Sequence, residues 1–440
     1  MAPQLNYRGA RLGITAVVLA GILSGGSVAG VAGAQGADAP GVTGNRVKLG
    51  FISSQTGIAS PTFTDSHEAC QARIDAQNAA GGVHGRKIDL EIIDDQSSGN
   101  LTAAQDLVQS RKVFAVINNS GLAFLAYRFL KDNGVPTIGG GFDGNYYGEK
   151  GNEIILSALG NVAPVNGLTP DWPAKIAKRL GATKMASIAY SVSPSGTASV
   201  EAVQKYAAPA FGLEDAYINT TLEFGSEDVQ PIVLGVKNSG ADALYLPLNT
   251  DTNFAIVQAL QQNGVKMKAN VLATGYSQEL LDQPVVNVMT PNDVLFSTYK
   301  PVELTKDAAV KEFRDNLEKH AGITGVPDYG VYTGYIACDM AVTGLEKAGA
   351  NTTRQRFVDG IRNLGEYDAA GLTCLPLQVG DDTYGKTPET SCNWFLIVKD
   401  GKFKILNGGK PIKSKLLGDP ELIAANRAGT ATTTTTAPAG

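Results

Sequence analysis

Small polar and aromatic side chains follow several predicted strands of this chain, in positions where they could bind a ligand. In open parallel sheets, ligands bind beyond the carboxyl ends of the strands, because loops and helix N-termini there present hydroxyl, amide and backbone N–H groups. The residues in such positions are Ser54, Gln55, Thr56, Asn118, Asn119, Ser120, Gly141, Phe142, Tyr190, Ser193, Asn249 and Tyr276. The sequence therefore predicts a site for a small organic molecule.

Some of these residues also fit a purely structural role. Ser120 could cap the N-terminus of the helix that follows it instead of contacting a ligand. Phe142 could pack between domains as readily as it could line a cleft. Asp251, which follows Asn249 closely, could cap a helix that begins near Thr252. Both roles stay open at these positions.

Catalytic motifs are missing from the sequence. Gly139, Gly141 and Gly144 match a dinucleotide fingerprint in spacing, but residues 145–148 do not open a helix. There is no Gly-x-Ser-x-Gly elbow and no His-Glu-x-x-His, and 3 histidines leave little scope for acid–base chemistry. No Cys-x-x-Cys or other ligand spacing indicates a metal. We predict a protein that is not an enzyme, with no catalytic residues, metal or cofactor.

The elements that must position these side chains begin at Val47. A strand over Val47–Ile52 is followed by a polar loop, an amphipathic helix that Gly81-Gly82 ends, and a second strand over Ile88–Ile93. Strands and helices then alternate along the chain, which predicts an α/β protein with parallel sheets covered on both faces. A hairpin around Asp400-Gly401 is predicted near the end. Both halves of the sequence show this alternation of strands and helices, and two similar lobes would explain it.

The N-terminus has the pattern of a secretory signal peptide. Arg8 and Arg11 precede the apolar run Leu12–Leu23, and Ala32-Gly33-Ala34 is a small-residue cleavage site, so we expect cutting after Ala34. The alternative is a membrane anchor, but this run is shorter than the ~20 apolar residues that a span needs. No cysteine follows it before Cys70, which argues against a lipid anchor. We expect a periplasmic or cell-envelope protein.

The net charge excludes some partners. Removal of the signal peptide takes away Arg8 and Arg11 and no acids, which changes the formal charge from −5 to −7. An acidic balance argues against nucleic acid or an anionic membrane as partner.

The 4 cysteines would lie in an oxidising compartment, where disulfides persist. Cys374 and Cys392 bracket a loop rich in glycine and aspartate, and we predict that they pair. Cys70 and Cys338 each lie in a predicted helix. Those two either pair with each other or remain buried thiols.

Several stretches together resemble one protein family. They are Phe51–Gly57, Asp75–Gly85, Ile93–Gln96, Asn133–Pro136, Gln261–Gly264 and Tyr332–Asp339. In order and spacing they resemble the periplasmic solute-binding proteins of ABC transporters, in the branched-chain amino-acid (Leu/Ile/Val) binding group of the type I fold. The likeness extends over about residues 46–410.

The resemblance implies two doubly wound parallel-sheet lobes joined by three crossover strands, with a small-molecule ligand held in the cleft and passed to a membrane ABC permease. Hinge closure around the ligand is then expected, as is a monomer. The loop at Ser120 would grip a ligand carboxylate. Tyr329 would turn toward the cleft, whereas its own sequence context favours packing within a helix. The alternative is a sensor that reports ligand occupancy to a membrane receptor. The expected parts are a signal peptide (1–34), a disordered leader (35–45), lobe 1 (46–157 with 301–370), lobe 2 (164–295 with 376–420) and a disordered Thr-rich tail (428–440).

The sequence departs from the family's amino-acid binders at two loops. The glycine-rich segment 139–142 replaces a loop of small hydroxyl residues, and Gly275-Tyr276-Ser277 stands where an acid would often lie. A buried ammonium without a charge partner would cost several kcal/mol. A branched-chain amino acid is therefore disfavoured, and a less charged ligand with aromatic or alicyclic surface suits Phe124, Tyr190 and Tyr276 better.

Overall fold

The computed structural model describes residues 39–141, 144, 146–160, 167–226 and 228–430. Within these ranges two large sheets, of five and nine strands, are built from successive parts of the chain. The predicted signal peptide, Phe142 and residues 431–440 of the predicted tail lie outside the described residues. No described helix is long and apolar enough to cross a bilayer.

The first sheet is parallel, with strand order β2-β1-β3-β4-β5. Its strands are β1 (Arg46–Ser53), β2 (Lys87–Asp94), β3 (Ala115–Asn119), β4 (Thr137–Gly139) and β5 (Ile155–Ser157). Side chains of β1 alternate between the two faces, and Leu49, Phe51 and Ile52 are completely buried. Because Ser53 pairs with Asn119 in register, the loops after β1 and β3 begin side by side.

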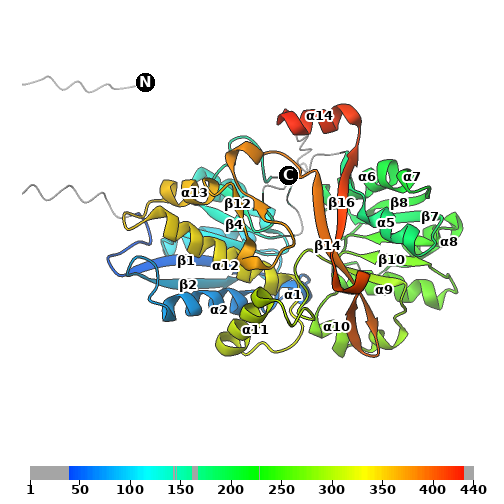
Figure 1. Ribbon diagram of the computed structural model, residues 1–440, viewed down its shortest axis with the longest axis horizontal. Helices are drawn as coiled ribbons and strands as arrows, with labels where there is room; N and C mark the ends of the chain where they lie inside the picture. Colours follow the sequence, from blue (N-terminus) through cyan, green and yellow to red (C-terminus); the bar gives the residue numbers. More distant parts are fainter. Residues whose placement is uncertain (1–38, 142–143, 145, 161–166, 227, 431–440) are drawn as a thin grey trace, which may run out of the picture. The chain divides into compact units, whose positions relative to one another are not determined.

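Helices cover both faces of this sheet (Figure 1). On one side, α2 (Ser66–Ala79) packs against α11 (Ala308–Ala321) and α12 (Tyr329–Ala348), and α13 (Arg354–Arg362) packs on α12. On the other side, α3 (Asn100–Gln105), its continuation as a π-helical turn, and α4 (Tyr127–Asp132) cover an apolar cluster. A short helix, α1 (Ser60–Phe63), lies against α12.

The contact between α2 and α12 is unusually close because of a glycine. A side chain at Gly334 would place its Cβ 2.3 Å from the carbonyl oxygen of Ser66, so only glycine fits there. The Arg73 guanidinium donates to the Asp339 carboxylate at 2.6 Å, and the Tyr367 hydroxyl donates to its other oxygen at 2.6 Å. The two helices are thus held by apolar packing and by a satisfied ion pair.

The second sheet is parallel on one side and antiparallel on the other. Its order is β6-β16-β14-β11-β10-β9-β7-β8, with β15 paired to β14. The strands are β6 (Leu168–Pro170), β7 (Lys184–Tyr190), β8 (Glu214–Leu222), β9 (Ala243–Leu246), β10 (Ala269–Leu272), β11 (Asp293–Ser297), β14 (Thr390–Lys399), β15 (Lys402–Ile405) and β16 (Ile412–Gly418). The helix–strand alternation predicted the parallel part. The predicted hairpin accounts for one antiparallel pair, β14 with β15, and in its turn Asp400 (φ +53°) and Gly401 (φ +69°) take the left-handed conformation. The antiparallel pairs of β14 with β11 and β16, and of β16 with β6, were not predicted.

Successive side chains of a strand point to opposite faces of this sheet, so its buried residues belong to two apolar clusters. Ala243 and Tyr245 of β9 face the cluster under α5 (Trp172–Arg179), whereas Leu244 and Leu246 face α8 (Gln230–Ser239) and α9 (Thr250–Gln262). The remaining elements are α6 (Pro194–Ala202), α7 (Ala208–Ala210), α10 (Gln278–Asp282), α14 (Pro420–Ala428) and the small pair β12 (Glu366–Tyr367) and β13 (Leu377–Gln378).

Both pairs of cysteines form disulfides. The predicted pair Cys374–Cys392 is confirmed. The two possibilities left open for Cys70 and Cys338 resolve in favour of pairing, and this bond joins α2 to α12. The described part of the chain contains no free cysteine.

The expected disorder of the leader is wrong for its described part. Val42 forms a bridge with Val47 and is buried. The amide of Lys48 donates to the carbonyl of Gly41 at 2.8 Å. Glycine and alanine content alone suggested disorder in residues 39–45, but one apolar side chain in register with β1 is enough to pack this segment on the sheet.

Candidate ligand-binding site

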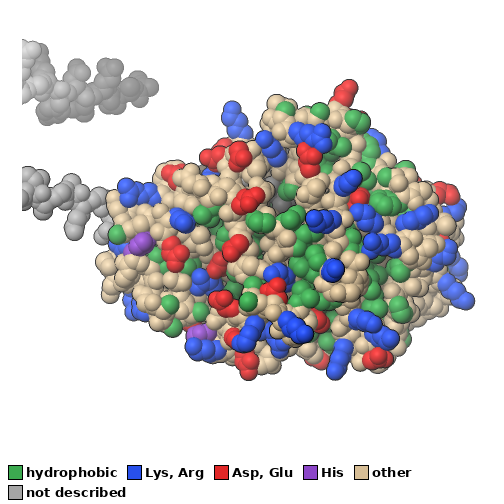
Figure 2. All heavy atoms as spheres, viewed as in Figure 1, with side chains coloured by type: hydrophobic (Ala, Val, Ile, Leu, Met, Phe, Trp, Pro, Cys, Tyr) green, Lys and Arg blue, Asp and Glu red, His purple; other side chains and the backbone are tan. Residues whose placement is uncertain are grey.

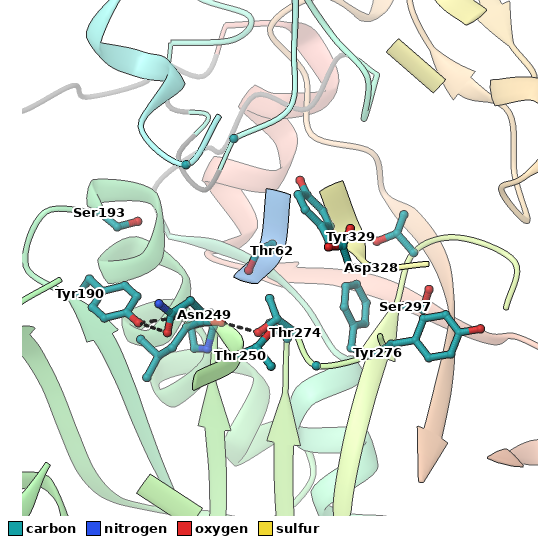
Figure 3. Close-up of a pocket in the computed structure, with 18 of the residues that line it drawn as sticks. Thr62, Tyr190, Ser193, Asn249, Thr250, Thr274, Tyr276, Ser297, Asp328 and Tyr329 are labelled. Atoms are coloured by element: carbon teal, nitrogen blue, oxygen red, sulfur yellow. Dashed lines mark hydrogen bonds between the residues drawn. The ribbon is translucent and has the colours of Figure 1, made fainter. Parts of the chain in front are cut away.

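A cavity of about 440 Å³ lies where the loops of both sheets meet the N-terminus of α12 (Figure 3). Its lining includes residues that follow β3, β4 and β5 of the first sheet and β7, β9, β10 and β11 of the second. A volume of this size accommodates a drug-sized small molecule. The described residues thus form a ligand-sized cavity at the strand ends where the sequence predicted one.

Nine aromatic rings of the described residues line the cavity. They belong to Phe124, Tyr190, Phe224, Tyr245, Tyr276, Phe296, Tyr299, Tyr329 and Tyr332. Several of the tyrosine hydroxyls are already bound by protein. Tyr190 donates to Asn249 Oδ1 at 2.7 Å, Tyr276 to Glu303 Oε2 at 2.6 Å and Tyr332 to the carbonyl of Lys300 at 2.8 Å. These residues therefore present mainly their rings to the cavity, which suits an apolar or aromatic ligand.

Two polar residues that line the cavity are also N-caps of helices. Asn249 is the N-cap of α9, and its side chain accepts a hydrogen bond from the amide of Thr252 at 3.0 Å. Ser277 caps α10 in the same way through Leu280. Burial raises the pKa of the Tyr190 hydroxyl that binds Asn249 to about 12, so this phenol stays neutral at physiological pH.

Asp328 is the one acidic or basic side chain among the described residues that line the cavity. It is the N-cap of α12 and accepts a hydrogen bond from the amide of Val331 at 2.7 Å. Burial, foremost, and the like charges of Asp65 and Glu279 raise its pKa to about 8, although the amide of Val331 acts in the opposite direction. Sequence reasoning missed this residue. An aspartate directly before a predicted helix indicates an N-cap, but nothing local shows that the cap faces a cavity.

Basic side chains lie elsewhere. Figure 2 shows Lys and Arg spread over the outer surface, and no Lys, Arg or His of the described residues lines the cavity. An anionic ligand would therefore find no charge partner among the described lining residues.

About half of the predicted site residues line the cavity. They are Gly141, Tyr190, Ser193, Asn249, Tyr276 and Tyr329. Ser193 and Asn249 are also N-caps, so the structural and the binding role coexist at these positions. The capping role suggested for Asp251 falls to Asn249. Contact with a ligand stays a prediction for all of them.

Ser54 and Ser120 lie behind the cavity wall, where they bind a buried carboxylate. Both are completely buried and neither lines the cavity. Ser54 donates to Asp95 at 2.9 Å, and Ser120 donates to the other oxygen of the same carboxylate. Asn100 adds a third donor at 2.9 Å. In this structure Ser120 is neither a helix cap nor a cavity residue, because Asp95 at the end of β2 accepts its hydroxyl.

The other predicted residues of the first sheet also make internal contacts. Asn118 exchanges two hydrogen bonds with Asn100, at 2.8 and 3.0 Å, and Asn119 donates to the carbonyl of Gly330 at 3.0 Å. Gln55 and Thr56 donate their amides to Asp94, at 3.0 and 3.2 Å. These four residues fix the loops that carry the cavity, through the side chains of Asn118 and Asn119 and the backbone amides of Gln55 and Thr56, and none of them is part of its lining.

Replacing Ser120 by alanine is expected to lower the free energy of unfolding by about 1–3 kcal/mol, because a buried carboxylate loses one of its donors. Urea unfolding measures this loss. Ser98→Ala is the control, since Ser98 is exposed, and it should change stability by less than about 0.5 kcal/mol. Equal stability of the two variants would contradict the role of Ser120 in holding Asp95.

Comparison with known proteins agrees with this geometry. The family model described as periplasmic binding protein matches residues 46–400. The chain is 22% identical over 362 residues to the Leu/Ile/Val-binding protein homolog 3 of Brucella melitensis, with 81% of this chain and 92% of the relative covered.

Two solved structures share the fold. The fatty acid ABC transporter substrate-binding protein from Thermomonospora curvata has a TM-score of 0.70 and 21% identity, with 84% of this chain and 93% of that chain covered. A solute-binding protein from R. palustris, solved in complex with 4-hydroxybenzoate, has a TM-score of 0.67 and 18% identity, with 84% and 97% covered. Together with the family match, the two-sheet α/β fold leads to one conclusion. The chain belongs to the periplasmic binding protein family, whose members are non-enzymatic substrate-binding proteins.

Proposed function

We propose that this protein captures a small organic solute outside the cytoplasmic membrane and delivers it to an ABC permease. The observation that carries the proposal is the aromatic-walled cavity of about 440 Å³, which is lined from both sheets. The predicted lobes, 46–157 with 301–370 and 164–295 with 376–420, would each contribute one sheet. Two disulfides agree with the oxidising compartment to which the predicted signal peptide would direct the chain.

Closure of the two lobes around the solute is part of the proposal. The chain passes from one sheet to the other after β5, after β11 and before β14, which fits a three-segment hinge. Ile58, in the loop after β1, lies against Gly225 after β8, since a Cβ at Gly225 would be 2.0 Å from its Cδ1. This contact supports a closed arrangement at the rim.

We further propose that the solute has an aromatic or alicyclic body and is not a branched-chain amino acid. Nine of the described residues that line the cavity are aromatic, and aromatic rings pack well against a ring-containing ligand. An α-amino acid would place its carboxylate in a cavity without a described cation.

A thermal-shift screen of the mature protein tests this function. Amino acids, amides, aromatic acids, aromatic alcohols and sterol-like compounds would be compared. A ligand present at about 100 times its dissociation constant stabilises the protein by about 2.7 kcal/mol, and an aromatic or alicyclic compound is expected to give the largest shift. If leucine, isoleucine or valine gives the largest shift, the proposed ligand class is wrong. If no compound shifts the melt, the cavity loses its role as the binding site.

A further inference from the structure

We propose that Asp328, Thr62 and Tyr299 form the polar end of the cavity, which binds a hydrogen-bond-donating group of the ligand, a hydroxyl or an ammonium, and rejects a carboxylate. This inference rests on the proposed function and specifies the chemistry of the ligand. These three residues are called the polar end below.

Two buried hydroxyls at this end have no partner. Thr62 and Tyr299 are each 2% exposed, both line the cavity, and neither Thr62 Oγ1 nor Tyr299 Oη meets a hydrogen-bond partner in the described part of the chain. Buried polar groups in native proteins are nearly always hydrogen-bonded. The two oxygen atoms are covered by protein, so a ligand supplies their missing partner only if these side chains turn toward the cavity when it binds.

Both hydroxyl residues flank the first turn of α12. Thr62 lies under Gly330, since a Cβ there would be 2.3 Å from the carbonyl oxygen of Thr62. The ring of Tyr299 stacks on Tyr332 with centroids 5.1 Å apart and lies 6.4 Å from the ring of Tyr329. Figure 3 shows Thr62 beside Tyr329 and Asp328. The unpaired hydroxyls and the carboxyl group thus belong to one end of the cavity.

The side chains whose charges act on Asp328 are acids. Asp65 from the N-terminus of α2 and Glu279 from α10 both act on Asp328, and Asp251 of α9 acts on Glu279. His67 is the nearby base, and it is paired with Glu68 at 3.0 Å. Burial, as the largest cause, raises the pKa of Asp65, Asp251 and Glu279 as well.

A ligand carboxylate would have to approach these acids without a cation. The N-terminus of α12 would ordinarily attract an anion, but Asp328 already occupies it as the cap. A hydroxyl or ammonium can instead donate to the Asp328 carboxyl and fill the unpaired hydroxyls. When Asp328 is ionised, at a pH above its pKa of about 8, the polar end therefore selects a donor.

Matched probes that differ only in their polar end test this inference. We would use 3-phenylpropan-1-ol, 3-phenylpropylamine and 3-phenylpropanoate, together with the alcohol, amine and carboxylate of octane, and measure thermal shifts and dissociation constants. The alcohols or amines are expected to bind at least about tenfold more tightly than the carboxylates, a difference of about 1.4 kcal/mol. Asp328→Asn keeps an N-cap, because asparagine caps helices as well as aspartate does, and it should remove most of this preference.

Asp251→Asn is the matched control. It also replaces an aspartate by an asparagine, but at an exposed residue that does not line the cavity. It should leave the preference for alcohols and amines over carboxylates unchanged. The inference is overturned if the carboxylates bind as tightly as the donors, if Asp328→Asn leaves the preference intact, or if no donor probe binds. If no donor probe binds but a compound of another class still raises the melting temperature, this inference fails and the proposed function remains supported.

The pH dependence separates the two kinds of donor. An amine needs the ionised Asp328, so its affinity should rise about tenfold per pH unit between pH 6 and 7.5 and level off above the pKa of about 8. An alcohol binds either form and should show a flat profile. In Asp328→Asn the slope for the amine should vanish, and a slope that persists would place the titrating group elsewhere.

Discussion

Replacing Ala273 by tryptophan is expected to lower the affinity for any ligand of the cavity by about 100-fold, or about 2.7 kcal/mol. Ala273 directly follows β10 and lines the cavity. An indole at this position would occupy space that a ligand needs. The backbone amide of Ala273, which donates to Leu246 at 3.1 Å, is unaffected by the change. Calorimetric titration with the compound found by thermal shift measures the loss.

A surface variant controls for the added ring. Leu234 on α8 is 58% exposed and lies outside the cavity lining, so Leu234→Trp adds an indole without entering the cavity. Its ligand affinity should equal that of the wild-type protein. If Ala273→Trp also binds with unchanged affinity while it remains folded, the ligand binds somewhere other than this cavity.

Removing the Cys70–Cys338 disulfide, by Cys70→Ala with Cys338→Ala, is expected to cost about 5 kcal/mol of the free energy of unfolding. The bond joins residues 268 apart in the sequence. A disulfide that closes a long loop restricts the unfolded chain most, and a 100-residue loop already contributes about 4.7 kcal/mol. Both sulfurs are completely buried between α2 and α12. Urea unfolding under non-reducing conditions measures the loss.

The second disulfide provides an internal comparison. Cys374 and Cys392 are only 18 residues apart, and a loop of about that size contributes roughly 3 kcal/mol. Cys374→Ala with Cys392→Ala should therefore destabilise the protein less. A larger loss for this pair would show that the long-range bond does not anchor the contact between α2 and α12.

Local patterns in the sequence predict much of the fold correctly. The opening strand, helix and strand, the later alternation and the hairpin at Asp400-Gly401 follow from side-chain periodicity and turn residues, which act over a few neighbouring residues. The antiparallel strands β6 and β16 carry no such signal, because their partners lie far away in the chain. The burial of Val42 was missed for a different reason: its bridge partner Val47 is close in the chain, but the glycine and alanine content of the segment suggested disorder.

The sequence also predicted only some of the cavity-lining residues correctly. The rule that ligands lie beyond strand ends led to Tyr190, Asn249 and Tyr276, which do line the cavity. It also led to Ser120, which turns instead toward Asp95. The direction of a loop side chain depends on which acceptor the packed structure brings near, and local sequence does not record that choice.

By itself, the sequence determined the α/β class, the family and the region in which a ligand should be sought, because these depend on short-range periodicity and on motifs in order. Only the tertiary structure decided which side chains enclose the cavity. It brought Thr62, Tyr299 and Asp328, which come from three separate segments, into the lining of one cavity. Their juxtaposition results from the packing of α1 and α12 at the strand ends, and long-range packing of this kind leaves no pattern in any one segment.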